Sequence, residues 1–192
     1  MNRRFFIAGF LLFLTACGGG SSDIVCESQY WDGNVGVCLP SGWRTVDKEQ
    51  LVEKGVPEEV VTAFQAETPI SGQYATVTVT EEPLEQEMTS EAYSEASVAS
   101  VESLPGFERI DEQEVAIDGQ TVMLHIFSAQ PRADQPKVRF YQVSAVGGMT
   151  GYTFTAAMPL AIADELEDEI LLIMRSATFE DPTVNETDDS DE

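Results

Sequence analysis

The sequence predicts an α+β fold, in which helices flank an antiparallel β-sheet. Two pairs of strand-like segments are separated only by turn residues, Asp118-Gly119 in one pair and Gly147–Thr150 in the other. Turns this short join antiparallel neighbours, because parallel strands need a long crossover connection. The helix-like segments do not alternate with the strands one by one, so we expect them to be segregated onto the faces of the sheet.

The first expected element is a hairpin closed by a disulfide. Residues 30–34 read as a turn, with Gly33 at the left-handed position of a three-residue loop. In that register Cys26 lies opposite Cys38, at a separation that a disulfide tolerates. We expect these two cysteines to be bonded, because an exported chain meets an oxidising compartment. Their spacing excludes a CxxC redox pair, and the single histidine of the chain argues against a zinc site.

Two short helices are expected after the hairpin. Asp47 and Gln50 resemble a capping box, which would begin a helix that runs to Lys54 and ends at Gly55. Pro57 suits the first position of a second helix, with two acidic residues at its positive end. The apolar face of this second helix would consist of Val60, Val61 and Phe64.

The middle of the chain predicts one strand and one longer helix. The segment Gln73–Thr80 alternates strictly and is rich in β-branched residues, which is typical of a strand with one solvated face. Thr89 caps a helix that extends to about Ser103, and Pro105-Gly106 breaks it. One stripe of this helix carries Tyr93, Ala96, Ser100 and Leu104.

The remaining elements are four strands and a final helix. Strands are expected at residues 107–117, 120–128, 137–146 and 151–158. Pro159 would open a last helix, Leu160–Arg175, in which acidic residues surround one apolar stripe. That stripe consists of Ile162, Leu166, Ile170 and Ile173. The segment 177–179 is expected to pack back onto the body of the domain.

The N-terminus has the features of a secretory signal peptide. Two arginines precede the apolar run Phe5–Leu14, which is about half as long as a membrane-spanning helix needs to be. Residues Leu14–Cys17 resemble the lipobox of bacterial lipoproteins. That resemblance implies cleavage after residue 16 and acyl chains such as palmitate on Cys17, and Gly18 favours the outer membrane, facing the periplasm. The alternative is an ordinary signal peptide with a chance cysteine.

These features divide the chain into four parts. A lipoprotein signal peptide occupies residues 1–16, and the lipidated cysteine with its flexible Gly/Ser-rich tether occupies residues 17–23. The folded domain is expected over residues 24–179, followed by an acidic, disordered tail at 180–192. A six-residue tether reaches only about 12–15 Å, so the domain is expected to lie close to its membrane.

The charge of the chain limits its partners. Asp and Glu number 34 against 10 Lys and Arg, for a formal net charge of −24. Cleavage after residue 16 would leave 8 basic residues and a net charge of −26. Such a field repels phosphates, which argues against a nucleic-acid partner. It also repels anionic lipid, so we expect the membrane to be engaged through the N-terminal lipid rather than through the protein surface.

Five pieces of the sequence, taken in order, resemble the PsbP/DcrB-like family. The pieces are residues 37–43, 89–104, 117–120 and 151–155, and the closing helix with Phe179. The resemblance covers about residues 35–179 and implies an α/β/α sandwich. The family includes photosystem assembly factors, phage-related envelope factors, a eukaryotic Ran-binding factor and uncharacterised lipoproteins. Because it shares a fold rather than a reaction, the resemblance implies no catalytic residue.

Few residues of the chain point to chemistry. The GxSxG, Walker, HExxH and EF-hand patterns are absent from the sequence. His125 is expected to be a hydrogen-bonded strand residue, although a pocket in which it bonds a carboxylate would support catalysis. Trp31 and Trp43 are expected in packing, with a ligand groove as the alternative. We therefore predict no catalytic residue, no cofactor and no metal ligand.

Two charged features leave alternatives open. Arg132, Lys137 and Arg139 gather around the Pro-rich loop 130–136, where they either dock an acidic partner or are simply solvated. The acidic cluster 164–169 either holds calcium or reflects a salt-rich habitat. The main hypothesis is a lipid-anchored protein of the bacterial cell envelope, a non-catalytic interaction or assembly module with an envelope protein as partner. A lipoprotein that binds a small ligand or calcium is the alternative.

Overall fold

The computed structural model describes residues 24–70 and 72–182. The expected signal peptide, Cys17, its tether and most of the acidic tail lie outside these residues. The strands of the described chain are β1 (Ser28–Trp31), β2 (Gly36–Leu39), β3 (Trp43–Val46), β4 (Val60–Ala66), β5 (Thr76–Pro83), β6 (Glu108–Ile117), β7 (Gln120–Ala129), β8 (Val138–Gly147) and β9 (Thr150–Met158). The helices are α1 (Lys48–Glu53), α2 (Ser90–Val101) and α3 (Asp164–Arg175).

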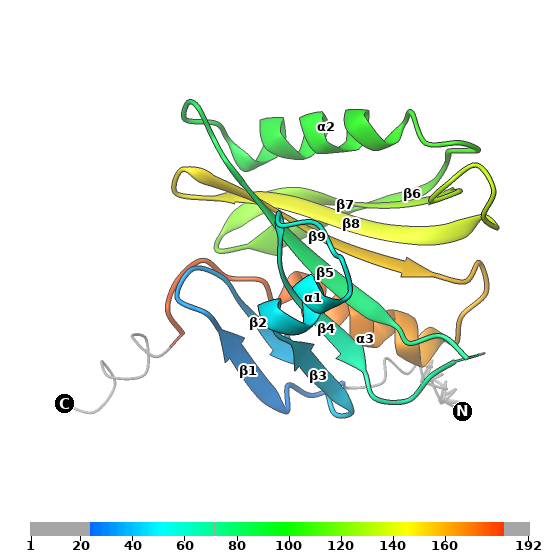
Figure 1. Ribbon diagram of the computed structural model, residues 1–192. Coiled ribbons are helices and arrows are strands. Elements are labelled where there is room, and N and C mark those ends of the chain that lie inside the picture. The colour runs from blue at the N-terminus through cyan, green and yellow to red at the C-terminus, as the bar shows by residue number, and fades with distance from the viewer. Residues whose placement is uncertain (1–23, 71, 183–192) are drawn as a thin grey trace, which may run out of the picture.

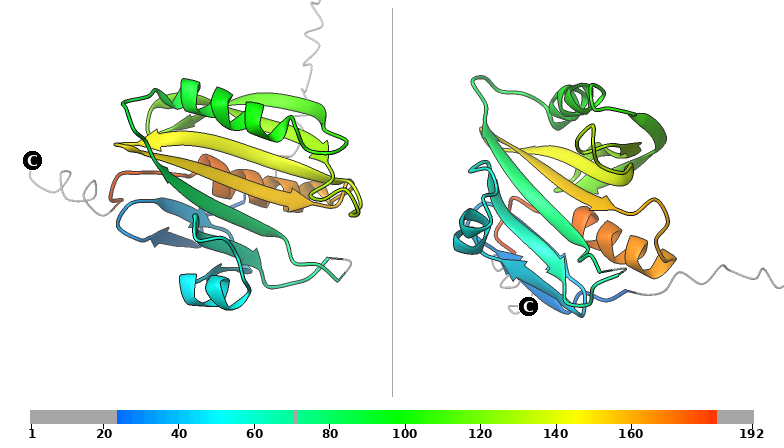
Figure 2. Two further views of the ribbon diagram at one scale, coloured as in Figure 1. Left: turned by 45° about the horizontal axis from the view of Figure 1, so that its top comes forward. Right: turned by 45° about the vertical axis from the view of Figure 1, so that its right-hand side comes forward.

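Seven of these strands form one antiparallel sheet, in the order β3-β4-β5-β9-β8-β7-β6. β1 and β2 pair with each other in a separate hairpin. α2 lies across one face of the sheet, over β7 and β8, whereas α3 and the hairpin cover the opposite face (Figure 1 and Figure 2). This architecture is the α+β fold that the sequence predicts, with helices on both faces of an antiparallel sheet.

The main hydrophobic core lies between the sheet and the layer formed by α3 and the hairpin. β5 shows how the sequence builds this core. Val77 and Val79 are fully buried in it, while the threonines that alternate with them along the strand point to the other face. Large side chains that are fully buried here are Phe64, Leu124, Tyr141, Phe154, Ile170 and Ile173.

Residues 60–66 form a strand, so the prediction of a second helix from Pro57 is wrong. β4 pairs with β3 on one edge and with β5 on the other. The run Val60-Val61-Thr62 is β-branched, and such side chains lose freedom in a helix but pack well on a pleated surface. Phe64 then reaches the core, where its ring meets Tyr30 edge to face. Pairing with distant strands outweighs the local resemblance to a helix start.

The N-terminal hairpin forms, but its register differs from the expected one. Gln29, not Cys26, lies opposite Cys38. The loop is longer because the Asp32 carboxylate accepts hydrogen bonds from the backbone N–H groups of Asn34 and Val35, each at 2.9 Å. Cys26 therefore lies just before β1. The expected disulfide with Cys38 is nevertheless present, across a Cα–Cα distance of 5.4 Å.

The expected helix ends are largely confirmed. The Asp47 carboxylate caps α1 and the Thr89 hydroxyl caps α2, through hydrogen bonds of 2.9 and 3.2 Å to the N–H groups three residues on. α3 begins four residues later than predicted, at Asp164, where carboxylates favour the positive end of a helix. Across the described ranges, no helix combines the length and the apolar character needed to cross a membrane.

Two tight turns join the strands of the sheet as predicted. Asp118 and Gly119 both have positive φ angles, of 46° and 73°, as a two-residue hairpin turn requires. After Met158 and α3, the chain returns to the β1–β2 hairpin through Thr178, which bridges to Gly36 of β2. The segment 177–179 thus packs back on the domain, with the Phe179 ring stacked on another aromatic ring.

Gly151→Ala tests how closely α2 is seated on the sheet. A Cβ added at Gly151 would overlap the ring of Tyr93, which lies directly on this backbone. We expect the variant to lose about 1–3 kcal/mol of unfolding free energy in urea titrations, as overpacking does. The control is the same substitution in a Tyr93→Ala background, where the space is free and the cost should largely vanish. An equal cost in both backgrounds would contradict this packing.

Candidate functional site

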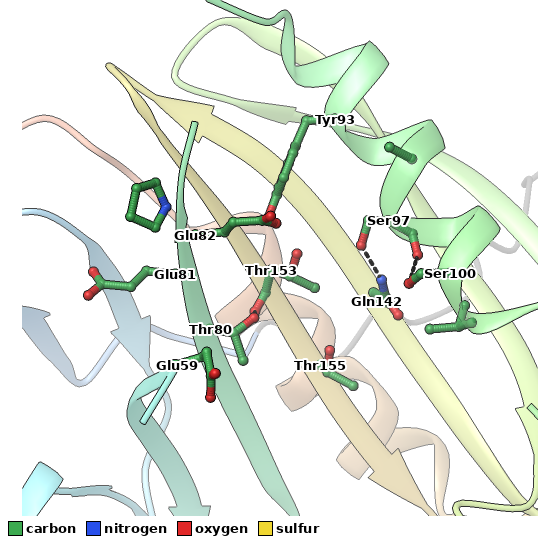
Figure 3. A pocket seen from close by; sticks show the side chains of 13 residues that line it. Glu59, Thr80, Glu81, Glu82, Tyr93, Ser97, Ser100, Gln142, Thr153 and Thr155 are labelled. Atoms are coloured by element: carbon green, nitrogen blue, oxygen red, sulfur yellow. Dashed lines mark hydrogen bonds between the residues drawn. The ribbon is translucent and has the colours of Figure 1, made fainter. Parts of the chain in front are cut away.

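A groove runs between α2 and the part of the same sheet face that α2 does not cover (Figure 3). It encloses about 670 Å³ and is bounded by α2 on one side and by β5 on the other, with β8 and β9 beneath. Small side chains of α2 leave this space open, namely Ala96, Ser97 and Ser100.

The floor of the groove is an ordered network of hydroxyl and amide groups. Gln142 donates through its side-chain nitrogen to the Ser97 hydroxyl at 2.7 Å. The Ser144 hydroxyl donates to the same oxygen at 3.0 Å and lies 2.9 Å from the Thr153 hydroxyl. On the next strand, Thr80 donates to the Thr153 carbonyl. The groove therefore presents pre-positioned polar groups among the carbon atoms of its lining.

The β5 side of the groove is acidic. Glu59, Glu81 and Glu82 are among its lining residues, and Figure 3 shows Glu82 directed toward Tyr93 and Glu81 directed away from α2. The Tyr93 hydroxyl lies 3.5 Å from a carboxylate oxygen of Glu82. Burial, with a further contribution from the charge of Glu82, raises the pKa of Tyr93 above its ordinary value of 10.0, so this phenol stays protonated and donates. The thirteen described residues that line the groove include no Lys, Arg or His.

The residues of the stripe predicted on α2 face different parts of the structure, some packing on the sheet and others lining the groove. Tyr93 is buried against the sheet, whereas Ala96 and Ser100 remain exposed and line the groove. The buried face of α2 consists of Ser90, Tyr93, Ser94 and Val98. The run of alanines and serines was the available sign that this helix does not fill its face of the sheet, but the sequence alone does not show where the space lies.

His125 joins a hydrogen-bonded chain on the other flank of α2. Its Nδ1 lies 3.0 Å from the Glu112 carboxylate of β6, and its Nε2 lies 3.3 Å from the Ser94 hydroxyl of α2. Arg109 forms an ion pair with the same Glu112 oxygen at 3.0 Å. A cavity of about 230 Å³, lined in part by Ser94 and His125, opens beside them. The strand histidine is thus hydrogen-bonded, and its partner is the carboxylate that a catalytic role would require.

The surroundings of Ser94 favour a structural role for this chain of groups. Ser94 is only 2% exposed and lies inside α2, where backbone N–H groups are already bonded within the helix. Stabilising an oxyanion needs donors aimed at the reacting atom, and helix-interior amides are not available for that. The interactions do tie α2 to β7 and β6, and through Arg109 they reach Glu102 at the end of α2.

The tryptophans and basic residues singled out in the sequence lie away from the groove. Trp43 is buried, and its indole N–H donates to Glu169 of α3 at 2.8 Å. Trp31 lies against Gly36 in the hairpin. Lys137 pairs with Glu108 at 2.8 Å, and Arg139 approaches the hydroxyl of Tyr141 at 3.3 Å. Packing therefore accounts for Trp43, and acids of the same domain engage part of the basic group.

The acidic residues of α3 do not converge. Glu169 accepts from Trp43, while Glu167 lies 3.9 Å from Arg139 on the sheet. Within residues 24–70 and 72–182, no group of three or more His, Cys, Asp or Glu side chains is arranged to hold a metal ion. These acids interact with several different parts of the domain.

The single histidine allows a clean test of its environment. Burial lowers the pKa of His125 below 6.5, although Glu112 opposes the shift, so the folded state favours the neutral ring. Its contribution to stability is complete above pH 6.5 and is lost as the pH falls through 6.5 toward the folded pKa, because the unfolded chain binds the proton first. We expect His125→Gln to flatten the pH dependence of urea unfolding as the pH falls below about 6.5. An unchanged slope in the variant would contradict this assignment.

Sequence comparison identifies no relative of the chain. No protein-family model matches it, and no curated protein sequence matches it.

Comparison of structures does find matches. The solution structure of cyanobacterial PsbP (CyanoP) from Synechocystis sp. PCC 6803 aligns with a TM-score of 0.54 at 14% identity, over 85% of this chain and 99% of that one. The Ran-binding protein Mog1p of Saccharomyces cerevisiae aligns with a TM-score of 0.51 at 12% identity, over 79% and 93%. A Pseudomonas aeruginosa protein of unknown function, described as a putative regulator, reaches 0.50 at 14%, over 73% and 88%. At these identities the likeness concerns the fold alone, and the fold of this chain is PsbP-like.

Proposed function

We propose that the chain is a lipid-anchored protein of the bacterial cell envelope, and that its domain acts as a non-catalytic interaction module. In this proposal the groove beside α2 binds a basic segment of a partner protein in the envelope. The observation that carries the proposal is the composition of the groove, with three glutamates along its β5 side, hydroxyl and amide groups on its floor, and no basic side chain among its described lining residues.

The anchor part of the proposal rests on the sequence. Leu14–Cys17 carries the lipobox pattern, and the described domain begins at Ile24, seven residues after the cysteine. Two or three acyl chains anchor a protein stably, whereas one chain would be marginal. The Cys26–Cys38 disulfide agrees with an oxidising compartment outside the cytoplasm.

The partner part of the proposal rests on charge and geometry. Lysine and arginine carry hydrogen-bond donors only, so they complement carboxylate and carbonyl oxygens. Glu81 and Glu82 follow one another at the end of β5, and Glu59 lies beside them because the Glu81 N–H donates to the Glu59 carbonyl at 2.9 Å. A chain laid along α2 would have the glutamates on its β5 side and Ser97 and Ser100 on its α2 side. The field of the acidic domain would also speed the encounter with a basic partner.

Two other functions have less support. Catalysis would need hydrogen-bond donors for an oxyanion beside the Ser94 hydroxyl, and the helix interior around this buried serine supplies none. Calcium binding would need several oxygen ligands around one point, whereas Glu169 of α3 accepts from Trp43 and Glu167 lies near Arg139.

Photo-crosslinking in cells tests the groove directly. A benzophenone side chain at Ala96, inside the groove, should capture one reproducible partner, and mass spectrometry should place the crosslink in a Lys/Arg-rich segment. The matched control is the same side chain at Glu49, which is exposed on α1. Capture of an acidic segment, or equal capture from both positions, would contradict the proposal.

Charge substitution provides the affinity measurement on the captured segment. Glu59→Gln, Glu81→Gln and Glu82→Gln together should weaken its binding about tenfold in calorimetry, since each exposed ion pair contributes about 0.5 kcal/mol. The control triple, Glu27→Gln, Glu49→Gln and Glu53→Gln, removes the same charge from exposed positions that do not line the groove. An equal loss in both triples would mean that only net charge matters, and the groove would not be the site.

Cys17→Ser tests the anchor. Lipid transfer needs the thiolate as nucleophile, and a serine hydroxyl is far weaker. We expect the variant to incorporate no radioactive palmitate and to leave the detergent phase or remain uncleaved, while the Cys26–Cys38 disulfide still forms. Palmitate incorporation equal to that of the wild-type chain would show that Cys17 is not the lipid-bearing residue.

A further inference from the structure

Four chain segments meet at one end of the sheet, which we call the anchor end. The register of the strands requires this, since Trp43 of β3 pairs with Ala66 of β4, and Ala156 near the end of β9 pairs with Val77 near the start of β5. The segments are residues 24–27, 40–43, 67–75 (without Ser71) and 159–163. The described chain therefore starts at the same end of the domain as the β4–β5 and β9–α3 connections (Figure 1).

The segments of the anchor end form one continuous surface. One cavity there is lined by Ile70, Tyr74 and Leu166, and a second is lined by Ile70, Leu166 and Glu165. A third, lined by Val25 and Glu165, shares that glutamate with the second. Shared residues thus connect the start of the described chain with the loop that carries Ile70 and Tyr74.

Large apolar side chains are concentrated on this surface. Of the seven exposed large hydrophobic residues of the described chain, four lie at the anchor end. They are Val25, Ile70, Tyr74 and Leu160, with exposed fractions of 72%, 38%, 50% and 47%. Two others, Val52 and Met149, lie at the opposite end, in α1 and in the β8–β9 turn, and Ile110 lies on the edge strand β6.

We propose that the anchor end rests on the membrane surface, with the side chains of Val25, Ile70, Tyr74 and Leu160 in the headgroup layer of the bilayer. This inference rests on the proposed lipid anchor at Cys17. Six residues lie between Cys17 and Ile24, and a flexible chain of that length spans about 12–15 Å. The tether therefore holds the anchor end of the domain, rather than the opposite end, next to the lipid.

The charges at the anchor end define the kind of contact. Glu27 and Glu67 lie in these segments, and Asp164 and Glu165 follow them directly at the start of α3, so anionic lipid does not attract this surface. The contact is hydrophobic and shallow, with the carboxylates left in water. Tyr74 suits such a position, because aromatic rings with a polar group favour the membrane interface. A contact of this kind should persist at high salt, whereas one based on charge would weaken.

A fluorescent label can measure this contact in the lipidated full chain. With Cys17 acylated and Cys26 bonded to Cys38, the variant Leu160→Cys supplies a single free thiol for an environment-sensitive dye. The control variant Val52→Cys places the same dye at the opposite end. Both proteins are reconstituted into vesicles of phosphatidylethanolamine and phosphatidylglycerol. We expect dye at position 160, but not at 52, to shift to the blue and to be quenched by a lipid-borne quencher, equally at 0.1 and 0.5 M salt.

The possible results separate the two proposals. Mass spectrometry without acyl chains on Cys17 would overturn the anchor, and this inference with it. A lipidated protein that floats with the vesicles, but whose dye at position 160 is as accessible to aqueous iodide as at 52, would overturn this inference alone. Protection from iodide without quenching from the lipid would mean that another copy of the protein covers the surface, which also overturns it.

Discussion

The width of the seven-stranded sheet is the constraint on which the rest of the structure depends. Neighbouring strands are about 4.8 Å apart, so the sheet is roughly 29 Å wide, whereas a helix with its side chains is only about 10–12 Å across. On one face α3 and the β1–β2 hairpin together provide enough cover to form the main core. On the other face α2 covers only β7, β8 and part of β9. Part of this face must therefore meet solvent.

The side chains of β5 fit a sheet with one covered face and one partly open face. Valines face the core, and threonines face the open side. The groove lies on this partly covered face, because α2 carries alanine and serine where a covering helix would carry large apolar residues. β5 runs from the anchor end, at Thr76, to the opposite end, where Glu82 lines the groove. In our account, lipid lies at the anchor end and the partner lies in the groove.

Local signals in the sequence were sufficient for most elements. The caps at Asp47 and Thr89, the Asp118-Gly119 turn and the alternation in β5 each depend on neighbouring residues. The two errors have different causes. The segment of β4 resembles a helix start, but pairing with the distant strands β3 and β5 decides its structure. The hairpin register depends on a local contact, in which the Asp32 side chain binds the backbone of its own loop and lengthens it.

The candidate site was less predictable than the fold. The sequence singled out His125 and the basic loop, but the groove is assembled from Glu59, β5, α2, β8 and β9, which only the tertiary structure brings together. Its serines and threonines are common residues without a motif. The partner of His125 lies on a neighbouring strand, at a register position that the sequence does not display.

The most direct test of this account is chemical-shift mapping of the ¹⁵N-labelled domain with the basic segment of its captured partner. The account predicts that the amide signals that move most belong to the groove, in particular to Glu81, Glu82, Ser97 and Ser100. Shifts centred on the edge strand β6 or on the anchor end, with the groove signals unchanged, would contradict it.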